Sequence, residues 1–148
     1  MTQEEKQLLL KDLCGRLRYG VRIHINSSIE EQNRMQLYDV NLESETIGVS
    51  NEKWTFRAIP IIDEDDDTKI IKPYLRPMSS MTEEECKELG DLPATFEGIG
   101  EVIPNVPYYI EVTRPEQIDW LNENHFDYRG LISMGLAIEA PEGMYKTE

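Results

Sequence analysis

The chain has little cysteine and no long apolar run, and each of these shortages excludes a class of protein. Cys14 and Cys86 are the two cysteines among 148 residues, so the disulfide framework of small secreted domains is excluded. No stretch approaches the ~18 consecutive apolar residues that a membrane-spanning helix needs. The first six residues carry acids where a secretory signal would carry bases. We therefore expect a soluble cytoplasmic protein.

Basic residues are also scarce. Acids outnumber bases 29 to 15, which gives a net charge of −14 and disfavours direct binding to DNA or RNA phosphates. An apolar content of 39% with 30% charged residues is typical of a globular protein, and the length predicts one domain over residues 1–148. The first segment is an exception to the acidic balance and predicts a small basic patch, made of Lys6, Lys11, Arg16, Arg18 and Arg22.

The N-terminal segment has the pattern of an amphipathic helix. Thr2 and Glu5 form a capping box, and Gly20 predicts the end of the helix. Leu10, Leu13, Cys14 and Leu17 recur at spacings of three and four. We therefore expect Cys14 to lie in the core.

Alternation of apolar and polar residues predicts an antiparallel sheet. The alternation runs over residues 21–26 and returns in three segments over residues 35–60. Short connections at residues 43–45 and 50–52 predict hairpins, and hence a meander with one face in solvent. The apolar face of this meander is expected to carry Tyr38, Val40, Leu42, Ile47, Val49, Trp54, Phe56 and Ala58.

The second half of the chain combines chain breakers with capped helices. Pro73 and Pro77 predict a surface loop over residues 63–81, and a Thr82–Glu85 capping box predicts a helix over residues 83–89. The fold class is therefore α+β, an antiparallel β-meander with helices packed on one face. Four more elements are expected: a strand through Tyr108, Ile110 and Val112, a helix that begins near Thr113, a fourth helix capped by Asp127 and ending at Gly135, and an edge strand at residues 136–139.

The acidic run at residues 63–67 is the first candidate site, since clustered carboxylates suit Ca²⁺ or Mg²⁺. A calcium loop would need glycine at Thr68 and glutamate at Tyr74. An aspartate-nucleophile phosphatase would need threonine where Asp67 or Lys69 stands. We interpret the run as a solvated acidic loop and predict no metal or cofactor; a metal-dependent hydrolase is an alternative.

Histidine and cysteine offer the second candidate. Cys14, Cys86, His24 and His125 lack the spacing of a zinc site. His24 lies on the polar face of its strand. The ring of His125 could be oriented by Asp119 or Asp127, but packing by Trp120, Phe126 and Tyr128 explains the same segment structurally. We favour the structural account and predict no catalytic residue.

A third candidate is an interaction surface. Two bases and an aromatic ring in a proline-flanked extended segment suit a partner's groove, although such segments also simply cover a sheet. The predicted interaction residues are Lys72, Tyr74, Arg76, Asp63, Asp65, Asp66, Asp67, Glu83 and Glu84.

Three segments, residues 72–85, 119–132 and 139–145, resemble short uncharacterised proteins from phages and other mobile elements of gut anaerobic bacteria. The resemblance covers about a quarter of the chain and brings no activity or site residue with it. It implies a small acidic protein that binds a host or element-encoded protein. We therefore expect a non-enzymatic accessory factor with a protein partner and no membrane contact. An inhibitor that mimics nucleic acid with residues 63–67 and 83–101 is an alternative within binding.

Overall fold

The computed structural model describes residues 2–62, 69–91, 101–102, 111–112 and 115–145. Within these residues it confirms the α+β class, with three α-helices and a six-stranded, mostly antiparallel sheet. The helices are α1 (Gln3–Arg16), α2 (Glu83–Asp91) and α3 (Pro115–Glu123). The sheet has the order β4-β3-β2-β1-β5-β8, and its strands are β1 (Arg22–His24), β2 (Met35–Asn41), β3 (Thr46–Ser50), β4 (Thr55–Pro60), β5 (Lys72–Leu75) and β8 (Ile138–Glu139). A separate two-stranded ladder joins β6 (Glu101–Val102) to β7 (Glu111–Val112).

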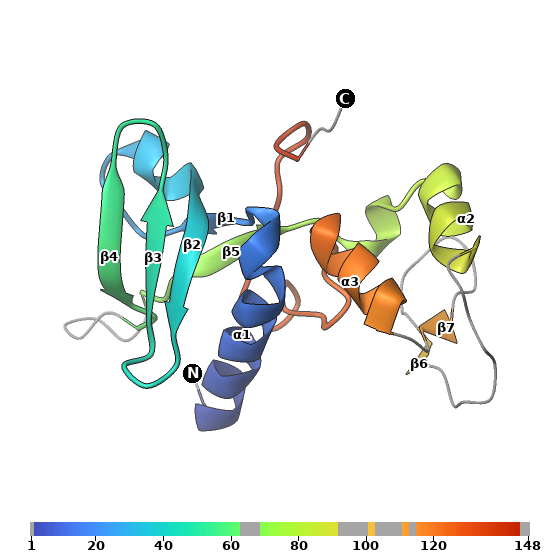
Figure 1. Ribbon diagram of the computed structural model, residues 1–148, viewed down its shortest axis with the longest axis horizontal. Helices are drawn as coiled ribbons and strands as arrows, with labels where there is room; N and C mark the ends of the chain where they lie inside the picture. Colours follow the sequence, from blue (N-terminus) through green and yellow to red (C-terminus); the bar gives the residue numbers. More distant parts are fainter. Residues whose placement is uncertain (1, 63–68, 92–100, 103–110, 113–114, 146–148) are drawn as a thin grey trace.

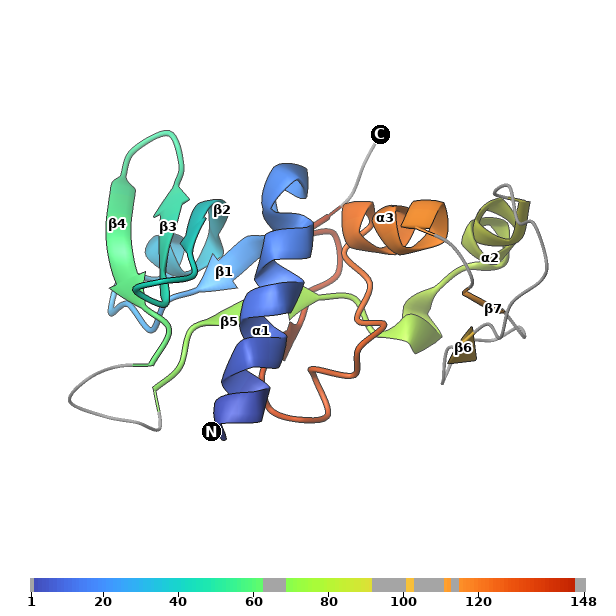
Figure 2. The same cartoon turned by 60° about the horizontal axis from the view of Figure 1, so that its bottom comes forward.

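The meander, α1, α3 and α2 follow one another along the longest axis of the molecule (Figures 1 and 2). In both views α1 stands between the β2–β3–β4 meander on one side and α3 on the other, with α2 beyond α3. The segment after α3 returns to the neighbourhood of α1, and the described chain ends near both helices. The helix α1 therefore has neighbours on two sides.

The predicted start and end of α1 are confirmed. The Thr2 hydroxyl accepts from the Glu5 amide at 3.0 Å and the Glu5 carboxylate accepts from the Thr2 amide at 3.1 Å, while Gly20 ends the following 3-10 turn with φ of 69°. On the predicted buried face, Leu10 and Leu13 are confirmed, but Cys14 was predicted wrongly because it is exposed. The face that packs inward carries Leu9, Leu10, Asp12, Leu13 and Arg16. Because Arg16 is buried, the expected basic patch is also wrong at this residue.

The meander is confirmed, but one of its faces differs from the prediction. Met35 and Leu37 are buried on β2, whereas Tyr38 is 39% exposed and Leu42 is 60% exposed. Between Leu37 and Asp39 the register of β2 against β3 shifts by one residue, because β2 contains an extra residue there. A one-residue shift moves the side chains that follow to the other face of a sheet.

Gly48 is the residue around which the meander bends. Both strands that pair with β3 shift register at this point, so two residues of β2 and two residues of β4 lie opposite Gly48. The ring of Tyr38 covers the glycine so closely that a Cβ atom there would lie 2.7 Å from the Tyr38 ring. On β4 the bulge includes Ala58 with φ of 53°. Paired bulges increase the local twist and curl the sheet.

The expected loop over residues 63–81 is wrong at β5, which pairs with β1 on one side and β8 on the other. Pro73 is tolerated for a geometric reason. The facing backbone groups of Arg22 and Tyr74 are joined through a tyrosine hydroxyl, described below. Because bonded and non-bonded pairs alternate in an antiparallel ladder, the adjacent Ile23–Pro73 pair exchanges no bond. The missing N–H of Pro73 therefore costs no ladder bond to β1.

The curled sheet is joined to itself at one end. Beyond β4, Ile61 accepts a hydrogen bond from the Ile71 amide at 2.9 Å, and Ile62 bridges Ile70, which leads into β5. Since β5 pairs with β1, the strands form a partly closed ring. Within the described part of the chain, closure is confined to this end, because residues 55–59 of β4 pair there with β3 alone.

Two separate hydrophobic clusters stabilise the fold. The sheet core combines α1 with the strands and is mainly aliphatic. The second, which we call the helical cluster, consists of Met78, Met81, Leu89, Trp120, Leu121 and Phe126. In the sheet core the buried residues are Leu9, Leu10, Leu13, Val21, Ile23, Met35, Leu37, Ile47, Val49, Ile61, Ile70, Ile71, Leu75, Leu131, Leu136 and Ala137.

The C-terminal elements agree only in part with expectation. The capping box of α2 is confirmed, with Thr82 and Glu85 joined at 3.1 Å in both directions, and β8 is the predicted edge strand. The predicted fourth helix is wrong, because residues 127–135 form turns. Of the strand expected near residue 110, Val112 lies in β7, and Tyr108 and Ile110 lie outside the described residues. No helix among the described residues is long and apolar enough to cross a membrane.

Candidate functional site

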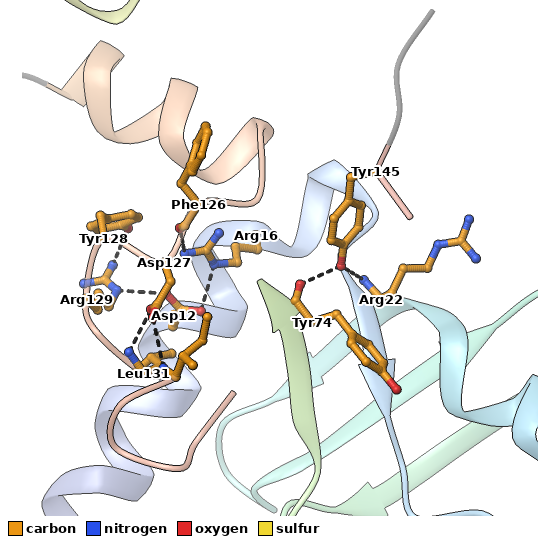
Figure 3. Close-up of polar contacts among 11 residues, drawn as sticks. Asp12, Arg16, Arg22, Tyr74, Phe126, Asp127, Tyr128, Arg129, Leu131 and Tyr145 are labelled. Carbon is orange, nitrogen blue, oxygen red and sulfur yellow. Dashed lines mark hydrogen bonds and ion pairs between the residues drawn. The ribbon is translucent and has the colours of Figure 1, made fainter. Parts of the chain in front are cut away.

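A buried polar cluster joins α1 to the turns that follow α3 (Figure 3). Arg16 is fully buried; its Nε donates to Asp12 at 2.8 Å and its Nη2 donates to the Phe126 carbonyl. The other oxygen of Asp12 accepts from Arg129 at 3.0 Å. A buried carboxylate is thus shared between two guanidinium groups, an arrangement that repays part of its desolvation cost.

Tyr128 and Asp127 complete this cluster. The Arg16 and Arg129 guanidinium carbons lie 5.4 and 4.7 Å from the centre of the Tyr128 ring. The Asp127 carboxylate accepts from the amides of Leu131 and Ile132 at 2.7 and 2.9 Å. Burial raises the pKa of Asp127, and these two hydrogen bonds partly offset the rise. The carboxylate therefore caps the turns in place of the predicted helix.

His125 lies beside this cluster and is buried, with φ of 62°. Its ring stacks on Tyr145 with a centroid distance of 3.8 Å. Burial, followed by the charges of Arg16, Arg76 and Arg22, lowers the pKa of His125 from 6.5 to about 4. Its Nδ1 has no hydrogen-bond partner among the described residues, and the Asp127 carboxylate bonds elsewhere, which contradicts the less favoured alternative that Asp127 orients this ring. Asp119 is exposed on α3.

Tyr145 anchors the end of the described chain to the sheet. Its hydroxyl accepts from the Arg22 amide at 2.8 Å and donates to the Tyr74 carbonyl at 2.7 Å, so it stands between β1 and β5 where a ladder bond would lie (Figure 3). Burial raises the pKa of this hydroxyl. The proton stays on Tyr145, and the hydroxyl can both donate and accept.

The described contacts of these groups are hydrogen bonds, ion pairs and ring contacts. The carboxylates of Asp12 and Asp127 accept hydrogen bonds from arginine or backbone groups. Neutral His125 contacts an aromatic ring. No group of three or more histidine, cysteine, aspartate and glutamate residues suited to a metal ion occurs in the described part of the chain.

A second candidate site is the open side of the curled sheet. A shallow groove of about 670 Å³ lies beside β4. Its described lining consists of Ile25, Ser27, Gln32, Thr55, Phe56, Arg57 and Ile59. Because Ile25 and Ser27 follow β1, the groove separates β4 from the segment after β1. We call this feature the seam.

The structure separates most of the predicted interaction residues. Tyr74 is 5% exposed and its ring contacts His24 edge-on, so this side chain is buried and not free to bind a partner. Lys72 is half-buried. Arg76 makes a two-pronged ion pair with Glu85, at 2.8 and 2.7 Å. Glu83 and Glu84 are exposed in the first turn of α2. Asp63, Asp65, Asp66 and Asp67 lie outside the described residues.

Sequence reasoning missed Asp12, Arg16 and Tyr145. The spacing of four between Asp12 and Arg16 was a usable signal, since it places the two side chains on one helix face. Nothing local marks Tyr145, because its partners are 123 and 71 positions away.

Comparison with known proteins gave no relative. No family model matches the chain. Neither the curated proteins nor the solved structures contain a match.

Proposed function

We propose that this protein is a small acidic accessory factor that binds another protein along β4, at the seam. The observation that carries the proposal is the outer edge of β4, which pairs with no other strand among the described residues, next to a groove with apolar walls. Exposed edges of this kind accept a strand from another chain, and main-chain hydrogen bonds supply the affinity.

The direction of the backbone groups supports this use of β4. Asn51 donates its amide to the Trp54 carbonyl at 2.9 Å, so these residues form a bonded pair. Ser50 and Thr55 are the next pair of the ladder, and bonded pairs alternate with non-bonded pairs. The N–H and C=O groups of Thr55 therefore face away from β3, toward the seam.

As the partner we propose a host or element-encoded protein, because the chain resembles proteins of phages and mobile elements. The net charge of −14 supports a protein partner over direct contact with nucleic acid, since phosphates would be repelled. The proposal needs no metal and no cofactor.

Affinity capture with matched variants tests the proposed function. The tagged wild type, Thr55→Val and Thr55→Pro would be exposed to lysate of a gut anaerobe, and retained proteins identified by mass spectrometry. Valine keeps the outward N–H of Thr55 and proline removes it. We expect a partner that the wild type and Thr55→Val retain and Thr55→Pro loses, with saturable binding of that purified partner in calorimetry.

Two outcomes contradict the proposal. One is the absence of any saturable protein partner. The other is a partner that all three proteins retain equally and that high salt releases, which would assign binding to the acidic surface.

A further inference from the structure

We propose that the seam selects an extended partner segment with alternating apolar side chains and one acidic side chain. This inference rests on the proposed function and adds the chemistry of the segment. It follows from three features of the seam: how much backbone it offers, what its walls are made of, and which charge it carries.

The free backbone of β4 is short. Thr55 offers its N–H and C=O groups, as argued above, but the bulge at Arg57 and Ala58 interrupts the strand and Pro60 has no N–H. Bulges and prolines are the usual protection of sheet edges against indiscriminate pairing. The seam therefore accepts a short strand, and side chains must supply much of the affinity and selectivity.

The walls of the seam suit a strand with alternating side chains. Ile25, Phe56 and Ile59 provide the apolar part of the lining, and all three are only partly buried against the sheet core. Side chains of an added strand point alternately toward and away from such a surface. Every second residue of the bound segment is therefore expected to be apolar.

Arg57 sets the preferred charge. Among the described residues that line the seam, Arg57 alone is charged, and it is exposed. No ion pair joins Arg57 to another described residue, in contrast to Lys53, which pairs with Glu31 at 3.2 Å. An exposed cation beside an apolar groove favours a carboxylate and disfavours an ammonium group in the bound segment. In a chain of net charge −14, this preference is the reverse of what the overall field would produce.

Fluorescence polarisation with synthetic peptides tests the inference. The probes are short peptides that alternate valine and serine around a central glutamate, or around a central lysine. We expect the wild type to bind the glutamate peptide about tenfold more tightly than the lysine peptide, which is the scale of one favourable charge pair. Arg57→Glu should reverse the preference. Lys11→Glu makes the same charge change on an exposed position of α1, outside the seam lining, and should preserve it.

The failure of this inference differs from failure of the proposed function. Equal affinity for both peptides, abolished by Thr55→Pro, would overturn the charge preference and leave strand addition intact. Binding of neither peptide would overturn the inference, while the capture experiment decides the function independently. A dimer in sedimentation that Thr55→Pro converts to monomer would assign the seam to a second copy of this chain and overturn the inference too. Circular dichroism of each variant serves to check that it is folded.

Discussion

The sheet core and the helical cluster bury their side chains in different ways. The sheet core is a broad aliphatic interior shared by α1 and the strands. The helical cluster is smaller and depends on directional contacts. Phe126 stacks on Trp120 at 5.7 Å, and the Arg76 guanidinium carbon lies 4.1 Å from the centre of the Phe126 ring. Area burial stabilises the first region, while ring and charge geometry holds the second.

The boundary between these regions is polar. From α1, Arg16 donates a hydrogen bond to the Phe126 carbonyl, and Arg76, which follows β5, donates to Glu85 of α2. We call these polar contacts the joint. Polar joints are sensitive to the loss of one partner, because the remaining group stays buried without compensation. The comparison therefore predicts that stability is lost most readily at the joint.

Breaking the joint should have the largest effect. In Arg16→Met, Asp12 keeps Arg129 but loses its closest cation, and the Phe126 carbonyl loses its donor. We expect the free energy of unfolding to fall by about 3–5 kcal/mol in urea denaturation. The control Lys11→Met, on an exposed position of the same helix, should stay within about 0.5 kcal/mol. A loss below about 1 kcal/mol for Arg16→Met would show that the joint does not hold the regions together.

Acid should act at the same boundary through His125. Its folded pKa of about 4 lies below its ordinary value of 6.5. As the pH falls through this interval, His125 becomes protonated in the unfolded chain but stays neutral in the folded chain. Stability is therefore lost from pH 6.5 downward, by up to about 3 kcal/mol near pH 4. Asp127 has the opposite sign, because its raised folded pKa adds stability as the pH falls.

A matched variant isolates the histidine contribution. His125→Asn removes the titration, and asparagine tolerates the positive φ. Urea midpoints would be compared from about pH 7.5 to about pH 4. At the upper pH we expect the variant to be less stable than the wild type, because the ring contact with Tyr145 is lost. Its urea midpoint should depend less on pH. An unchanged slope would mean that other groups cause the acid sensitivity.

Tyr145→Phe should have a smaller effect on the sheet. The Arg22 amide and the Tyr74 carbonyl lose their shared partner, at an expected cost of about 1–3 kcal/mol. Hydrogen exchange of the Arg22 amide should accelerate, which a general loosening of the helical cluster would not cause selectively. Tyr19→Phe, whose hydroxyl lies outside the β1–β5 pair, is the control.

The two capping boxes give the smallest and sharpest comparison. Thr2→Ala weakens α1 in the sheet core and Thr82→Ala weakens α2 beside the helical cluster, each by about 1 kcal/mol. Hydrogen exchange then reports whether the regions open together. If the helical cluster opens independently, Thr82→Ala should accelerate exchange in α2 and α3 while leaving β2 and β3 unchanged. Uniform acceleration would indicate one cooperative unit.

Local patterns were sufficient to predict part of this fold. Capping boxes at Thr2 and Thr82 depend on residues three positions apart, and the strands of the meander follow from an equally local alternation, so these elements were predicted correctly. The buried face of β2 was not, because the extra residue after Leu37 depends on pairing with β3. Pro73 misled us into predicting a loop, because the register of β5 against the distant β1, which local pattern does not show, turns the position without an N–H away from β1. The seam was not predictable from local pattern, since it arises when a curled sheet brings Ile25 near Phe56.

The paired bulges at Gly48 have a consequence for folding. If β3 slid by one position against β2, the glycine would leave the spot beneath the Tyr38 ring, and a bulky side chain would have to enter it. A misaligned pairing of β2 with β3 is thereby penalised. A single small residue favours one alignment of these two strands.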